Sequence, residues 1–262
     1  MSKLIKQTKT RYSKKFHYYA NDNVIGQSLA LYGEYSELEV MFLTSITNEN
    51  CVVYDIGANI GYHTTAFASR ALHVYAFEPH PKTFEILSKN TKDLANVTAL
   101  NYAVSNFNGV SKCLDYDPAL PANYGSVSVD DIKGVLEVTC VSLNHLTDEL
   151  PDIIKIDVEG NEYPVIQGCI EVIRKKNPVV YFEAHETPNL EEILDLLGTC
   201  PYVFYWAPVM NYNADNFKKN NDNIFGNSML TSIIAWPDHL PGLPGLRMVD
   251  RTDLSITYQA TP

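Results

Sequence analysis

The stretch that decides the fold is Val53-Tyr-Asp-Ile-Gly-Ala-Asn-Ile-Gly-Tyr62. It continues an apolar run that begins at Cys51 and breaks at Gly57, a pattern typical of a short buried strand. A helical pattern follows over residues 60–71, so the glycines occupy a strand-to-helix turn. Glycine lets the backbone pass close to a ligand at such a turn. The stretch therefore predicts a small-molecule site at the end of the first strand.

Strand and helix patterns alternate on both sides of this turn. Upstream, Ser36-Glu-Leu-Glu39 has the capping-box pattern and predicts the start of a helix. Downstream, helical patterns run over 84–94, up to Lys176, and over 190–197. Such alternation predicts an α/β fold, with a mostly parallel sheet, helices on both faces and ligands at the carboxyl ends of the strands. The further strands expected are 73–78, 97–104, 153–158, 179–184, 202–209 and 229–236.

The organisation along the chain follows from shifts in this pattern. We expect a basic N-terminal extension over residues 1–31, one α/β domain over 32–236 and an irregular tail over 237–262. Between 107 and 142, Gly and Pro separate short alternating runs, which predicts a small antiparallel β insertion. Six Lys and Arg residues precede the first acid, Asp22, and we expect them to form a solvated tail.

The composition disfavours several classes of protein. Twenty Lys and Arg against 31 Asp and Glu leave a formal charge of −11, which disfavours a protein that holds nucleic acid by its phosphates. The five cysteines are scattered without a C-x-x-C pair, unlike a zinc site or a disulfide framework. The first residues carry no apolar signal segment, and no apolar run reaches transmembrane length. We therefore expect a cytoplasmic protein without stable membrane insertion.

Two carboxylates stand where the first two strands end. Asp55 lies beside the glycine turn, where it would repel a pyrophosphate and suit a ligand that presents a cation. Glu78 ends the second strand, 21 residues past Gly57, at the place of an acceptor for two ribose hydroxyls. Because NAD and S-adenosylmethionine share this ribose contact, Glu78 predicts a nucleoside without choosing between them. Asp55 favours S-adenosylmethionine.

Three segments carry a resemblance to a known family. Val53–Tyr62, Ala76-Phe-Glu-Pro79 and Ile154-Lys-Ile-Asp-Val-Glu-Gly-Asn-Glu162 are similar to motifs of the FkbM family of S-adenosylmethionine-dependent methyltransferases. The resemblance covers residues 32–236 and is most specific at Lys-Ile-Asp-Val-Glu-Gly. It implies the class I methyltransferase fold, a Rossmann-like sheet of seven strands. It also implies methylation of a hydroxyl on a sugar, a glycan or glycolipid, or a small natural product.

The same resemblance implies how the chain would bind S-adenosylmethionine and its product S-adenosylhomocysteine. The glycine turn would hold the methionine half and Glu78 the ribose. The adenine pocket would run past Val104, and Tyr35 would close over the cofactor. The residues implied at the glycine turn are Asp55, Gly57, Ala58, Asn59 and Gly61.

Candidates for catalysis stand at the ends of the fourth and fifth strands. Asp157 would border the transferred methyl group, Glu159 would lie on the rim, and Lys155 could be an internal counter-ion. His185 is the best candidate for the base that takes the hydroxyl proton, because histidine ordinarily titrates near pH 6.5. Asp157 or Glu159 could serve instead. Together with Glu183 these groups also offer ligands for a divalent metal ion, a question the sequence leaves open.

The acceptor is expected to be a small molecule or a glycan hydroxyl, not a nucleic acid. Its recognition is expected in 107–142 and in 207–228, where many Asn and Tyr side chains suit sugar hydroxyls as well as they suit any polar loop. Three alternatives stay open: a nicotinamide-dependent oxidoreductase or epimerase of a nucleotide sugar, an N-methyltransferase of the same fold, and a catalytically silent binding module. The oxidoreductase should show a third loop glycine and lack Asp55, so it fits less well.

Overall fold

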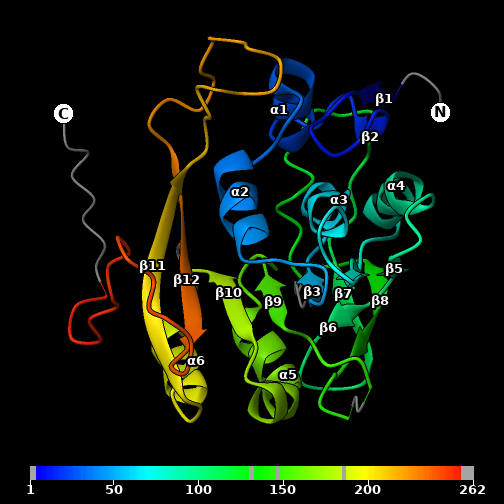
Figure 1. The fold of residues 1–262 in the computed structure, drawn as a ribbon. Coiled ribbons are helices and arrows are strands. Elements are labelled where there is room, and N and C mark those ends of the chain that lie inside the picture. The colour runs from blue at the N-terminus through cyan, green and yellow to red at the C-terminus, as the bar shows by residue number, and fades with distance from the viewer. Residues whose placement is uncertain (1–3, 130–132, 146–147, 185–186, 255–262) are drawn as a thin grey trace.

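A seven-stranded sheet is the centre of the structure, a computed structural model that describes residues 4–129, 133–145, 148–184 and 187–254 (Figure 1). The strand order is β11-β12-β10-β9-β3-β4-β5. Neighbouring strands are parallel except at β12, which runs antiparallel to both β10 and β11. The mostly parallel sheet expected from the sequence is confirmed. Its strands are β3 (Val52–Ile56), β4 (His73–Phe77), β5 (Val97–Leu100), β9 (Ile153–Ile156), β10 (Val179–Glu183), β11 (Tyr202–Met210) and β12 (Met229–Pro237).

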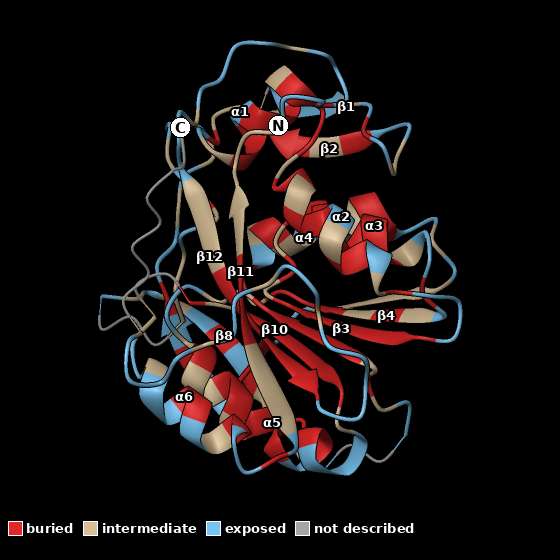
Figure 2. Cartoon of the chain, turned by 60° about the vertical axis from the view of Figure 1, so that its left-hand side comes forward, coloured by how far each residue is buried: buried red, intermediate tan, exposed pale blue. Residues whose placement is uncertain are grey.

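Helices cover both faces of this sheet (Figures 1 and 2). One face packs against α5 and α6, and the other against α2, α3 and α4. The central strands β3 and β9 are buried along their whole length, which explains their uninterrupted apolar runs. The helices are α2 (Glu37–Ser45), α3 (Tyr62–Ala68), α4 (Pro81–Thr91), α5 (Glu162–Lys176) and α6 (Leu190–Leu197).

The strand expected over 97–104 is in fact two strands in different sheets. β5 ends at Leu100, and β6 (Ala103–Val104) joins a second sheet with β8 (Leu136–Val141) and β7 (Gly109–Cys113). The β7–β8 pair is antiparallel, as expected of the insertion, whereas β6 runs parallel to β8. The break has a local cause, because the Asn101 amide donates to the main-chain oxygens of Glu78 and Pro79 at 2.8 and 2.9 Å.

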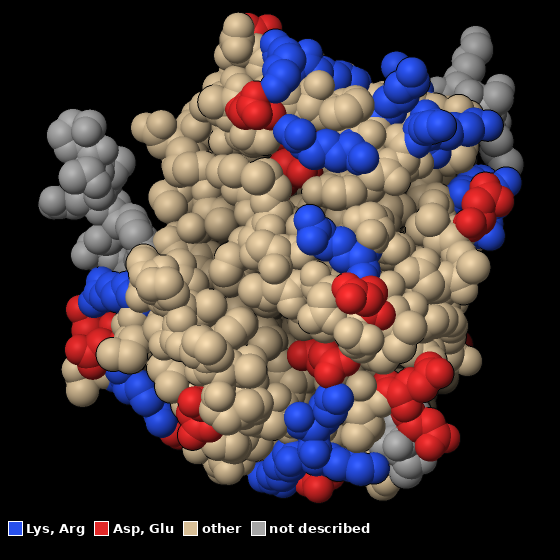
Figure 3. All heavy atoms as spheres, in the orientation of Figure 1, with Lys and Arg blue, Asp and Glu red and all other residues tan. Residues whose placement is uncertain are grey.

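The N-terminal residues are not the solvated tail that their charge predicts. β1 (Ile5–Thr8) and β2 (Phe16–Tyr19) form an antiparallel hairpin, and α1 (Ile25–Tyr32) follows. Phe16 is fully buried and meets the ring of Tyr62 edge to face at 5.8 Å. Lys and Arg side chains gather on the surface of this upper region, while the aromatic residues between them face inward (Figure 3). The apolar pattern within 16–19 outweighs the charge of its neighbours.

The described residues after β12 form no helix or strand, yet they lie along β11. The main-chain nitrogen of Trp206 donates to the oxygen of Arg247 at 2.8 Å, and that of Val249 donates to the oxygen of Phe204 at 2.9 Å. Among all the residues that the structure describes, no helix is both long enough and apolar enough to cross a bilayer.

Candidate active site

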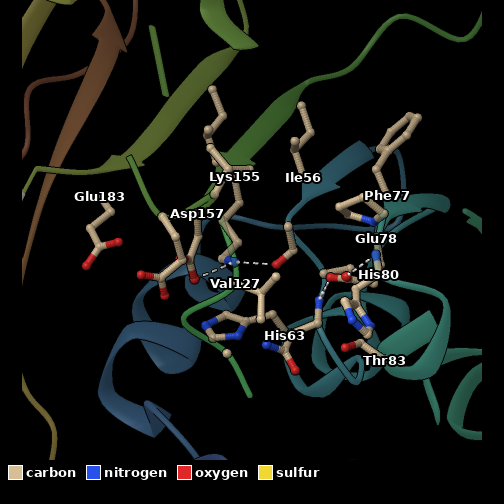
Figure 4. A pocket seen from close by; sticks show the side chains of 18 of the residues that line it. Ile56, His63, Phe77, Glu78, His80, Thr83, Val127, Lys155, Asp157 and Glu183 are labelled. Atoms are coloured by element: carbon tan, nitrogen blue, oxygen red, sulfur yellow. Dashed lines mark hydrogen bonds and ion pairs between the residues drawn. The ribbon is translucent and has the colours of Figure 1, made fainter. Parts of the chain in front are cut away.

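A cavity of about 290 Å³ opens at the carboxyl ends of the central strands (Figure 4). The ends of β3, β4, β9 and β10 form its floor. Residues from other parts of the chain also line it, among them the start of α2 with the residues before it, the insertion at 123–129, and the β11–β12 connection near Asn211 and Phe225. The site expected at this edge of the sheet is therefore a real cavity, enclosed by segments far apart in the sequence.

The glycine turn after β3 has a shape that a side chain would prevent. Gly57 has a φ of +78°, and a Cβ atom there would lie 1.7 Å from the main-chain oxygen of Asp157. The main-chain nitrogens of Gly57 and Ala58 both donate to the oxygen of Phe77, at 3.0 and 2.9 Å. The turn is thus tied to β4 on one side and pressed against the end of β9 on the other. Gly57, Ala58 and Asn59 all line the cavity.

Glu78 projects into the cavity wall from the end of β4. Its side chain accepts hydrogen bonds from the main-chain nitrogens of Asn59 (3.0 Å) and His80 (2.9 Å), and only 7% of the residue is exposed. Burial raises its pKa to about 7, although the two main-chain donors partly offset that rise. The carboxylate is held in one orientation beside the glycine turn, where the sequence placed the ribose acceptor.

Asp55 lies behind the cavity, which corrects the expectation that it faces a cationic ligand. It is fully buried and does not line the cavity. One carboxylate oxygen accepts from the Thr64 hydroxyl at 2.6 Å, and the other lies 3.6 Å from Nζ of Lys155. The same Nζ is 3.1 Å from Oδ2 of Asp157. The cation beside Asp55 is therefore supplied by the chain itself, and Lys155 is also the counter-ion of Asp157 that the sequence suggested.

The pKa of Lys155 reflects this arrangement. Burial lowers it, but the carboxylates of Asp157, Asp55 and Glu39 outweigh burial and raise it above its ordinary range. Lys155 is therefore charged at neutral pH and holds Asp157 at the edge of the cavity.

Three carboxylates stand at the cavity mouth. The side chain of Asp157 is 41% exposed, and Glu183 lies at the end of β10 (Figure 4). Glu159 has a φ of +55°, so the chain turns out of the strand direction and leaves this residue exposed at the rim. Loss of hydration at the crowded mouth, reinforced by the neighbouring carboxylates, raises the pKa of Glu159 to about 7 and that of Glu183 to about 8. His185, the expected base, falls outside the described residues.

The other expected cofactor residues divide between the cavity and its support. Tyr35 and Val104 line the cavity. Gly61 does not; it has a φ of +89°, begins α3, and its missing Cβ makes room for Leu87, whose Cδ1 would lie 2.7 Å away. The conformation of Gly61 thus serves the packing of α3 on α4, which corrects its assignment as a direct contact.

Sequence reasoning missed a pair of side chains from two helices. Ser36 has a φ of +47° and makes no capping bond, so the predicted capping box does not form. Glu39 instead turns to the cavity wall, where its Oε2 lies 3.5 Å from Nε2 of His63. In the sequence, only the position of His63, two residues past the glycine turn, indicated that its side chain could face the cavity.

A stack of aromatic rings was also missed. The rings of His80 and Tyr116 stack at 4.4 Å, and those of Tyr116 and Tyr124 stack at the same distance. His80 and Tyr124 line the cavity, so the insertion contributes to the same chamber as the glycine turn. Burial lowers the pKa of His80 to about 4, which keeps this imidazole neutral.

A metal site is absent from the part of the chain that the structure describes. There, no group of three His, Cys, Asp or Glu side chains has a geometry that could hold an ion. The ligand set suggested by the sequence included His185, which lies outside that part.

The topology and the site together define a class of protein. An antiparallel β12 inserted between β10 and β11, a glycine turn after the first sheet strand and a carboxylate at the end of the second are the features of a class I S-adenosylmethionine-dependent methyltransferase. The chain belongs to the FkbM family, because the family model for the methyltransferase FkbM domain matches residues 55–204. The family implies S-adenosylmethionine as the methyl donor.

Two named methyltransferases are similar to this chain. The hexuronic acid methyltransferase AglP of Haloferax volcanii is 29% identical over 61% of this chain, and the match spans 66% of its own length. The methyltransferase sdnD of Sordaria araneosa is 27% identical over 70% of this chain and 86% of its length. A crystal structure of a methyltransferase FkbM from Methylobacillus flagellatus is 15% identical, with a TM-score of 0.47 over 71% of this chain and 43% of that one.

Proposed function

We propose that this methyltransferase transfers a methyl group from S-adenosylmethionine to a hydroxyl of a sugar, a glycan or a related small natural product. The observation that carries the proposal is that one cavity holds both the cofactor features and polar side chains from outside the cofactor fold. The glycine turn and Glu78 line it together with Asn123 of the insertion and Asn211 of the β11–β12 connection. The name of the relative AglP, a hexuronic acid methyltransferase, supports a sugar acceptor.

The residues around the cavity fit S-adenosylmethionine. Glu78 offers a fixed carboxylate to the ribose hydroxyls, and Phe77, Val104 and Cys140 provide an apolar wall for the adenine. Asp157 faces the cavity with a carboxylate suited to a positively charged ligand. When bound, the cofactor supplies a methyl group activated by its sulfonium. The main task of the chain is then to orient the acceptor oxygen, which can contribute about 7–11 kcal/mol of the barrier.

The proposal is tested in two independent steps. Calorimetric titration with S-adenosylhomocysteine, and separately with NAD, examines the cofactor. Transfer of labelled methyl to the methyl glycosides of glucose, glucuronic acid and glucosamine then examines the acceptor. We expect binding of S-adenosylhomocysteine alone and an O-methylated glycoside among the products. Binding of NAD alone would contradict the whole assignment, whereas S-adenosylhomocysteine binding without transfer to any glycoside would contradict only the acceptor class.

The acidic mouth favours one second candidate, N-methylation of an amine. Glu39, Asp157, Glu159 and Glu183 all line the cavity, and the one lysine among the described lining residues, Lys155, is already paired with two carboxylates. An ammonium group would be attracted to this mouth, whereas a hexuronate would be repelled. Methylation of the glucosamine nitrogen, with its hydroxyls untouched, would establish this alternative over the first proposal.

Glu78→Gln is expected to weaken binding of S-adenosylhomocysteine about 10- to 150-fold, the equivalent of losing a charged hydrogen-bond acceptor worth about 1.5–3 kcal/mol. The pKa of Glu78 is raised to about 7. Ribose hydroxyls donate best to the ionised form, so affinity in the native protein should rise about tenfold from pH 6 to pH 8 as the proton is lost. The variant should lose this pH dependence.

Calorimetry at pH 6, 7 and 8 checks both expectations. Glu85→Gln is the matched control, because Glu85 is an exposed carboxylate on α4 whose partner is Lys89. Its affinity and pH profile should match those of the native protein. A Glu78→Gln variant with native affinity at pH 8 would remove Glu78 from the ribose site.

The connection between β11 and β12 is held over the cavity by α1. The Tyr32 hydroxyl donates to the main-chain oxygen of Asp222 at 2.5 Å and accepts from the nitrogen of Ile224 at 2.9 Å. The main-chain oxygen of Tyr32 also accepts from the nitrogen of Lys218 at 3.0 Å. We propose that the N-terminal segment fixes this connection as one wall of the acceptor site.

Tyr32→Phe is expected to loosen this connection without disturbing α1. The lost hydrogen bonds are worth about 1 kcal/mol, so the form in which the β11–β12 connection has detached from α1 should become about fivefold more populated. Tryptic cleavage after Lys218 or Lys219 should accelerate by the same factor. Mass spectrometry of timed digests measures the rate. Tyr163→Phe, on α5, is the control, and equal cleavage in the two variants would contradict the role of Tyr32.

A further inference from the structure

The buried pair of His63 and Glu39 faces the cavity and takes no part in the cofactor contacts described above. His63 is 7% exposed on the first turn of α3, and Glu39 is 5% exposed on α2. Nε2 of His63 lies 3.5 Å from Oε2 of Glu39. Figure 4 shows the imidazole of His63 among the side chains that line the cavity. Two helices therefore bring an imidazole and a carboxylate together in the wall of the candidate active site.

The imidazole is not satisfied by the protein. Nε2 of His63 is buried and has no hydrogen-bond partner among the described residues, since its approach to Glu39 does not meet hydrogen-bond geometry. A buried polar nitrogen without a partner is costly, so Glu39, at 3.5 Å, is the group that can compensate Nε2 and fix the tautomer of the ring. The position is informative as well, because His63 follows the glycine turn that would hold the methionine half of the cofactor.

We propose that His63 is the general base of the methyl transfer and that Glu39 is its positioning residue. The proposal rests on the function proposed above. A carboxylate beside Nε2 favours the tautomer that carries its proton there, which leaves Nδ1 as the proton acceptor. As the acceptor oxygen forms its bond to the methyl carbon, the O–H bond breaks and its proton passes to Nδ1. The electron pair of the broken S–C bond stays on sulfur as a neutral thioether, and solvent later takes the proton.

The charged surroundings of His63 are compatible with this role. Glu39 faces it from α2, Asp157 and Lys155 line the same cavity from the end of β9, and the ring of Tyr62 meets the imidazole edge to face at 6.4 Å. Because Lys155 is bound to Asp55 and Asp157, Glu39 is the carboxylate left to accompany a protonated imidazole. The other expected base candidates, Asp157 and Glu159, stand at the rim and are more exposed.

His63→Ala is expected to lower kcat about 1,000-fold, within the range for loss of a general base, while the affinity for S-adenosylhomocysteine stays unchanged. Free imidazole should restore part of the turnover, which a purely structural role would not allow. Glu39→Gln should lower kcat about tenfold without rescue by imidazole. The measurement uses the glycoside of the panel with the highest turnover, and His239→Ala, in the exposed C-terminal segment, is the control.

An NMR measurement on the native protein needs no acceptor. With ¹⁵N-labelled histidine, we expect His63 in the tautomer protonated at Nε2, with signals that shift when S-adenosylhomocysteine binds. Full activity of His63→Ala, or His63 signals indifferent to bound S-adenosylhomocysteine, would overturn the base assignment. Failure of the native protein to bind S-adenosylhomocysteine at all would instead overturn the proposed function.

Discussion

Lys155→Met is expected to lower the free energy of unfolding by about 3–5 kcal/mol, the cost of leaving a buried charge without its partner. The Lys155 side chain is 2% exposed and lies 3.6 Å from Asp55 and 3.1 Å from Asp157. Asp55 is fully buried, so water cannot replace the lost ammonium. Methionine keeps most of the aliphatic volume, so the loss reports on charge more than on packing. Urea unfolding followed by circular dichroism measures it.

Two further variants isolate the electrostatic cause. Lys176→Met removes a lysine that pairs with Asp152 at 2.9 Å but has a 40% exposed side chain, and it should cost no more than about 1 kcal/mol. Asp55→Asn added to Lys155→Met should recover part of the lost stability, because the amide needs no counter-ion. Equal losses of unfolding free energy in the two lysine variants would show that the charges paired with Lys155 do not stabilise the end of β9.

The fold could be predicted from the sequence because its central elements carry local signals. Parallel strands buried on both faces appear in the sequence as short apolar runs, and β3, β9 and β10 lie within a residue or two of their expected bounds. The turn at Gly57 and Gly61 was visible because positive φ angles favour glycine. The same local information placed Glu78 at the end of β4, where the structure has it.

What the sequence could not predict depends on contacts between distant segments. The partner of Asp55 is Lys155, one hundred residues away, so a carboxylate beside the glycine turn looked like a ligand contact. His63 and Glu39 meet only when α2 packs against α3. The hairpin at Phe16 was not predicted because the lysines around it suggested a solvated segment. Whether Phe16 is buried depends instead on the surface against which the hairpin packs.

Gly57→Ala is expected to weaken binding of S-adenosylhomocysteine about 100-fold, or about 2.7 kcal/mol, since the turn that lines the cavity must move to admit the added atom. The added Cβ would lie 1.7 Å from the main-chain oxygen of Asp157 and 2.8 Å from its carbon, neither of which is a flexible side-chain end. The end of β3 or the end of β9 must therefore move. Either shift would alter the turn at Ala58 and Asn59 and the position of Asp157 in the cavity.

Gly245→Ala separates the clash from the backbone strain. Gly245 has a φ of +88°, close to that of Gly57, but nothing lies within 4 Å of its added Cβ. It should cost about 1–2 kcal/mol of stability for the left-handed conformation and leave S-adenosylhomocysteine affinity unchanged. Calorimetry and urea unfolding of both variants give the comparison. If Gly57→Ala binds like Gly245→Ala, the close approach of β3 to β9 does not shape the cofactor site, and the cavity would have to be formed by the segments that cover it.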